Sequence, residues 1–232
     1  EQEPKDVPAL FYLSHIALKT HEYELAAKTL DKILNIDPTS NLEQILAGIA
    51  PENAQDREIL LNALRASTEK DNPSILALIA GLEAQDGLYE QALKNINRAL
   101  RKRSKSTSFI LMKANLLMAL QDDEATQKWF AKASRKNKEN LDIRLAEARY
   151  YIQINDQQTA LEKLEDVIKD HPNAEEALFI AGLTSIDLKQ YEKAEQYLVD
   201  LRNSSKYQNE AYYYLAINAQ RKQHYETAKA YY

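Results

Sequence analysis

Apolar residues recur along this chain at the spacing of amphipathic helices. In the first segment, Leu10, Leu13 and Ala17 occupy one helical face, and the same spacing returns over residues 26–33. Residues three, four and seven positions apart lie on the same side of an α-helix. Short polar stretches such as 85–87 separate these segments. The pattern therefore predicts pairs of helices joined by tight turns.

A four-residue motif repeats at spacings close to multiples of 34 residues, and we call this set of positions the lattice. Tyr-x-x-Ala begins at Tyr23, Tyr89, Tyr191 and Tyr225, and successive copies lie 66, 102 and 34 residues apart. The second gap is three times 34, and the first is two short of twice 34. Such a period indicates stacked units that cannot bury their apolar faces alone. After an N-terminal extension over 1–6, a single solenoid is predicted over 7–232, with units starting near residues 7, 42, 73, 107, 141, 175 and 209.

Small residues stand at two fixed positions of these units. The eighth position holds Ser14, Ala80, Ala114, Ala148, Gly182 and Ala216, and the twentieth is alanine in all of these units except one. This pattern resembles the tetratricopeptide repeat. The resemblance implies an all-α fold: a right-handed α-α superhelical solenoid of about seven helix-turn-helix repeats.

Three features depart from the repeat pattern. Pro51 interrupts the first helix of the second unit, so that unit is degenerate and one long helix over about 51–69 is expected. The last unit is truncated at Tyr232, which predicts a fragment of a longer array or of a multidomain chain. Lys113 and Glu147 replace the Leu that the family prefers at position seven. They pair with each other, or their charged ends reach solvent separately.

Composition and motifs narrow the function. The net charge is −5 and the sequence pI about 5.5, which argues against nucleic acid or an anionic membrane as the main partner. No apolar run approaches the length of a membrane span. The four histidines are scattered, there is no cysteine, and no phosphate-binding or nucleophile motif occurs. We therefore expect no enzyme, no metal and no cofactor.

Two runs of cations form a possible basic rim. They are one repeat apart and comprise Arg98, Arg101, Lys102 and Arg103, and then Arg135 and Lys136. Cations are common at helix C-termini, so a solvated rim is the simpler interpretation. The alternative is an acidic partner, an anionic surface or RNA.

The family resemblance also suggests where a partner binds. In similar proteins the first helix of each repeat lines a concave groove. The matching residues here are Phe11, Tyr12, His15, Leu111, Met112, Asn115, Leu145, Arg149, Ile152, Phe179, Asp187, Tyr213, Tyr214 and Arg221. They predict a scaffold or adaptor that holds a protein or peptide.

A second function fits the same repeats. The solenoid is then a spacer or presentation arm of a larger multidomain protein, for example one of the cell envelope. The chain is similar to bacterial members of the family, which points to the periplasm or envelope, with the cytoplasm as the alternative.

Overall fold

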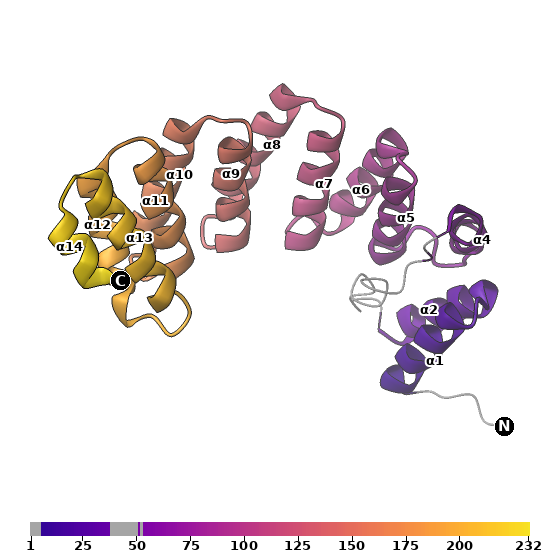
Figure 1. Ribbon diagram of the computed structural model, residues 1–232. Coiled ribbons are helices and arrows are strands. Elements are labelled where there is room, and N and C mark those ends of the chain that lie inside the picture. Colours follow the sequence, from indigo (N-terminus) through magenta and orange to yellow (C-terminus); the bar gives the residue numbers. More distant parts are fainter. Residues whose placement is uncertain (1–5, 38–50, 52) are drawn as a thin grey trace. The chain divides into compact units, whose positions relative to one another are not determined.

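The computed structural model describes residues 6–37, 51 and 53–232, and over these residues the chain forms helices and no strand (Figure 1). By its contacts the chain divides into two compact units, Glu1–Gln127 and Lys128–Tyr232. The first contains α1 (Val7–Lys19), α2 (Tyr23–Ile36), α4 (Ala54–Arg65), α5 (Pro73–Gln85), α6 (Tyr89–Lys102) and α7 (Thr107–Ala119). Helix α8 (Asp123–Lys136) crosses the boundary. The second unit continues with α9 (Leu141–Gln153), α10 (Gln157–Asp170), α11 (Glu175–Asp187), α12 (Tyr191–Val199), η1 (Asp200–Asn203), α13 (Gln208–Arg221) and α14 (Tyr225–Tyr231).

The predicted helical hairpins are present, and one backbone conformation closes their turns. His21, Gly87, Gln121, Asn155, Lys189 and Gln223 all have φ between 55° and 75°. After α9, Asp156 N–H donates to Tyr151 O at 2.8 Å, and Asn155 N–H donates to Ile152 O at 3.0 Å. This is the Schellman arrangement, which satisfies the last carbonyls of a helix and reverses the chain. A left-handed residue therefore recurs in the hairpin turns, mostly without a glycine to supply it.

Small residues let the two helices of a hairpin approach each other. Ala92, Ala160 and Ala194 have no exposed surface. Gly182 on α11 is also buried, with Leu198 of α12 directly against it. These contacts explain why the lattice positions accept only small side chains.

Helix α4 is shorter than the helix expected over about 51–69. It begins after Asn53, whose side chain accepts a hydrogen bond from Asp56 N–H at 2.8 Å. Beyond its end, Ser67 Oγ donates to Asp31 of α2 and accepts from Glu69 N–H at 3.0 Å. The expectation was wrong because these side-chain hydrogen bonds cap the helix and turn the chain. The unit start near residue 42 lies outside the described residues.

Candidate protein-binding face and a charged pocket

Three first helices of the second unit, α9, α11 and α13, are linked by side chains. The Arg149 guanidinium of α9 pairs with the Glu176 carboxylate at the start of α11. Phe179 of α11 meets Tyr214 of α13 edge to face, with ring centroids 5.7 Å apart. These contacts place predicted groove residues from successive first helices near one another. We call the surface carrying Arg149, Phe179, Tyr213 and Tyr214 the first-helix face.

Aromatic rings form a connected series on this face. Phe179 stacks on Tyr207 at 4.9 Å, and Tyr214 meets Tyr213 at 5.2 Å between centroids. Tyr213 in turn lies 6.4 Å from Tyr232. Half of Tyr213 is exposed (51%), as is most of Tyr232 (73%). Edge-to-face and offset contacts of this kind hold the rings in fixed orientations while leaving their outer edges open to a partner.

The predicted groove residues do not all reach the surface. Leu145 is buried, in one core cluster with Leu161 of α10 and Ala181 of α11, so its side chain does not reach the surface. The exposed ones are Tyr12, Asn115, Arg149, Asp187, Tyr213 and Arg221, and the half-buried ones are Phe11, His15, Leu111, Met112, Ile152, Phe179 and Tyr214. Those on α1 and α7 belong to the first unit. Whether any of them binds a partner stays a prediction.

The first cationic run is largely engaged within the fold. Arg98 pairs with Asp71, and Lys102 Nζ donates to the Asp71 carbonyl at 2.6 Å. Arg103 donates to Ser74 Oγ at 3.1 Å. These three cations therefore bind Asp71 in the turn before α5 and Ser74 in the first turn of α5. Arg101 is exposed. Arg135 and Lys136 belong to the second unit, and a continuous basic rim stays a prediction.

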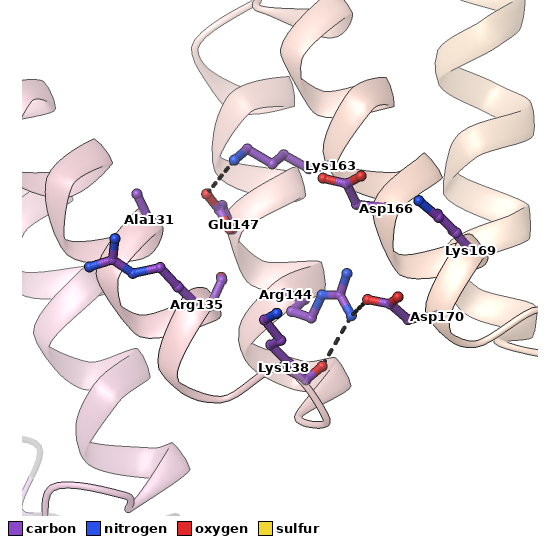
Figure 2. A pocket seen from close by; sticks show the side chains of 10 residues that line it. Ala131, Arg135, Lys138, Arg144, Glu147, Lys163, Asp166, Lys169 and Asp170 are labelled. Atoms are coloured by element: carbon purple, nitrogen blue, oxygen red, sulfur yellow. Dashed lines mark hydrogen bonds and ion pairs between the residues drawn. The ribbon is translucent and has the colours of Figure 1, made fainter.

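A polar hollow of about 360 Å³ lies on another side of α9 (Figure 2). Successive helix residues are rotated by about 100°, so Arg144 and Glu147 point away from Arg149 on the first-helix face. The walls come from α8, α9, α10 and the turn after α8. The lining residues are Ala131, Ser134, Arg135, Lys138, Arg144, Glu147, Lys163, Asp166, Lys169 and Asp170.

Two ion pairs span this hollow. Arg144 Nη1 donates to the Lys138 carbonyl at 3.0 Å and lies 2.8 Å from Asp170 Oδ2. Lys163 Nζ lies 3.2 Å from Glu147 Oε1, an ion-pair distance without the alignment of a hydrogen bond. Figure 2 shows Lys138 and Arg144 on one side, with Glu147 and Lys163 across from them. The pair of Lys113 with Glu147 stays a prediction; Lys113 Nζ donates to Asn97 Oδ1 at 2.8 Å.

Sequence analysis did not identify this pocket. A signal was available: on the 34-residue lattice, Arg144 occupies the position filled by Leu10, Leu76 and Ile110 in other units. Its side chain and that of Glu147 are about 10% and 3% exposed. Nearby, burial and the charge of Glu147 raise the pKa of Tyr151. A charged residue at a lattice position that is otherwise apolar was the available sign.

Within the described residues, no group of three or more histidine, aspartate or glutamate side chains is placed to hold a metal ion. None of the described helices combines the length and the apolar character that crossing a bilayer requires.

Stacked helical hairpins and a first-helix face with exposed aromatic rings define a helical-repeat protein. Residues 145–207 match the family model for the tetratricopeptide repeat. Over these residues the resemblance inferred from the repeat positions is confirmed. No curated protein matches the chain.

Solved structures show the same fold. The C-terminal part of a tetratricopeptide repeat protein from Cytophaga hutchinsonii is 17% identical, with a TM-score of 0.64 over 95% of this chain and 76% of that one. YrrB, described as having an unusual peptide-binding site, is 18% identical, with a TM-score of 0.53 and coverage of 74% and 88%. MamA from Desulfovibrio magneticus is 18% identical, with a TM-score of 0.54 and coverage of 68% and 90%. Identities this low show the fold alone.

Proposed function

We propose that this chain is a non-catalytic scaffold that holds a protein or peptide partner on its first-helix face. Tetratricopeptide repeat folds are commonly protein–protein interaction scaffolds. YrrB, which shares the fold, has an unusual peptide-binding site, and this supports a peptide as the kind of partner.

One observation carries the proposal: the connected rings of Phe179, Tyr214 and Tyr213 end in the half-exposed ring of Tyr213. Burying Tyr213 in the core would stabilise the fold, whereas an exposed ring with a fixed orientation is suited to a partner. Tyrosine and arginine are frequent anchors of protein interfaces because they combine apolar area with polar ends and lose little entropy. Arg149 provides the second anchor.

The chemistry of the face suggests the partner segment. The aromatic rings favour apolar or aromatic side chains, and charges at Arg149, Asp187 and Arg221 favour flanking residues of opposite sign. A helical segment with apolar residues on one side or an extended apolar peptide has these properties. In the first unit, the same role is proposed for Phe11, Tyr12, His15, Leu111, Met112 and Asn115.

Site-specific photo-crosslinking in native extract tests the proposal. A crosslinker replaces Tyr213 in one variant and Arg149 in another. A matched control carries it at Glu162, an exposed residue of the second helix α10. We expect one protein to be captured from both face positions and not from the control. With that partner purified, Tyr213→Ala should raise the dissociation constant at least about tenfold.

Other outcomes point elsewhere. Equal capture at Glu162 would mean that the partner does not use this face. Capture of nothing by either face position would instead favour the spacer or presentation arm, in which the repeats position another part of a larger protein.

A further inference from the structure

We propose that the charged pocket on α9 is a binding site for a small molecule that carries two negative charges. The site is separate from the first-helix face. Its ligand class is that of phosphate monoesters and small dicarboxylates, which share compact double charge. A hollow of about 360 Å³ is at the lower end of the size range of small-molecule sites.

The charge of the lining favours a dianion. Five cationic and three anionic side chains surround the hollow, so its net charge is plus two. Arg144 and Lys163 have carboxylate partners in Asp170 and Glu147. In the described part of the chain, Arg135, Lys138 and Lys169 have no ion pair from their side chains, and among the lining acids only Asp166 lacks one. A ligand of charge minus two would therefore neutralise the pocket.

Keeping this pocket polar lowers the stability of the fold. Glu147 is only 2% exposed, and Arg144 is 9% exposed, where a helix in a repeat protein usually places apolar side chains. Removing charges from water costs free energy that their mutual attraction returns only in part. Within the described part of the chain, two buried oxygen atoms of the wall, Ser134 Oγ and Glu147 Oε1, also make no hydrogen bond. Apolar residues in this space would make the fold more stable. A binding role therefore explains the polar wall.

The contacts of Arg144 orient its guanidinium group for a ligand. Its Nη1 atom donates a hydrogen bond to the Lys138 carbonyl and forms an ion pair with Asp170. These two contacts fix the plane of the guanidinium and the position of Lys138 in the turn. Charge-assisted hydrogen bonds to oxoanions are the strong ones, and they gain from donors that are already oriented. Lys138 in the turn after α8 and Lys169 of α10, both in the lining, provide further positive charge for the ligand.

Titration followed by amide NMR and calorimetry tests the inference on the whole chain. The probes are glycerol phosphate, succinate and inorganic phosphate, with acetate as the monoanion. We expect a dianion to shift amides of residues 131–147 and 163–170, and acetate to shift them far less. Glycerol phosphate without succinate identifies a phosphate site, and the reverse identifies a dicarboxylate site. Binding of no dianion up to about 10 mM overturns the proposal.

Substitutions separate a built site from general attraction. Lys138→Gln and Lys169→Gln should each weaken binding about three- to tenfold. Lys132→Gln makes the same charge change on the exposed surface of α8, outside the pocket lining, and should leave binding within about twofold. Equal effects from all three would overturn the site.

A double substitution gives the sharpest control. Arg144→Leu with Glu147→Leu removes one charge of each sign, so the net charge stays plus two while apolar side chains fill the hollow. We expect binding to be lost while helix content and thermal stability are kept, since other units carry leucine at these lattice positions. Unchanged binding in this folded variant would show that net charge alone attracts the anion, and the proposal would fall.

Discussion

Gly182 on α11 lies so close to Leu198 on α12 that a methyl group at Gly182 would sit 2.7 Å from Leu198 Cγ. Leu198 has no exposed surface and cannot move aside freely. We therefore expect Gly182→Ala to lower the free energy of unfolding by about 1 kcal/mol, because overpacking outweighs the gain in helix propensity. Urea unfolding of the whole chain measures the change.

Gly81 provides the matched control. It also lies inside a first helix, but a methyl group there would have only Met112 Cε near it, at 4.0 Å. Gly81→Ala should stabilise the protein by up to about 1 kcal/mol. If both substitutions shift the urea midpoint in the same direction, packing against Leu198 does not decide the residue at position 182.

The left-handed turn residues give a second prediction. Lys189 has φ 59°, a conformation that costs a residue with a Cβ about 1 kcal/mol. Gly87 occupies the corresponding turn position with φ 75°. Lys189→Gly should raise the melting temperature slightly, and Gly87→Ala should lower it. Calorimetry that found a loss for Lys189→Gly would contradict the strain assigned to this turn.

A third prediction concerns the buried carboxylate of Glu147. Lys163→Met removes its ion-pair partner and should lower the free energy of unfolding by about 3 kcal/mol, since a buried charge is left uncompensated. Adding Glu147→Leu should restore most of that loss. Lys193→Met removes an exposed pair with Glu165 and should cost less than about 1 kcal/mol. Chemical denaturation of the wild type, Lys163→Met, Glu147→Leu and their double variant measures the coupling, and additive losses would disprove it.

Alkaline pH should destabilise the fold through two tyrosines. Burial raises the pKa of Tyr23 to about 12, with the Asp56 carboxylate adding to the shift. Burial and a hydrogen bond to Glu165 raise the pKa of Tyr197 to about 12 as well. In the unfolded chain these phenols ionise near pH 10. Their stabilising contribution is therefore complete below pH 10 and is lost as the pH rises toward 12.

The check is the pH dependence of urea unfolding between pH 8 and 12 in the wild-type chain and in Tyr197→Phe. Phenylalanine cannot ionise, so the variant should lose stability less steeply above pH 10. Parallel curves would show that Tyr197 ionises at the same pH in the folded and unfolded states. Tyr225, which is 59% exposed, is the control position for the same substitution.

The helical hairpins and the family resemblance could be predicted because their determinants are local. The Tyr-x-x-Ala phrase and the small residues at Ala148 and Gly182 mark where helices must cross closely, whatever the partner helix is. The helices α5, α7, α9 and α11 begin at the residues where the lattice begins its units. By contrast, α4 ends early because Ser67 binds Asp31, which is far away in the sequence.

The sequence by itself determined the repeat period, the helical faces and the turns, because each depends on residues within about one helical hairpin. Tertiary structure decided which side of a helix is covered. Leu145 and Arg149 are both placed in the groove by position, yet packing buries the first in the core and leaves the second exposed. The pocket around Arg144 and Glu147 likewise exists only once α8 and α10 stand beside α9, since burial and ion pairing arise between helices.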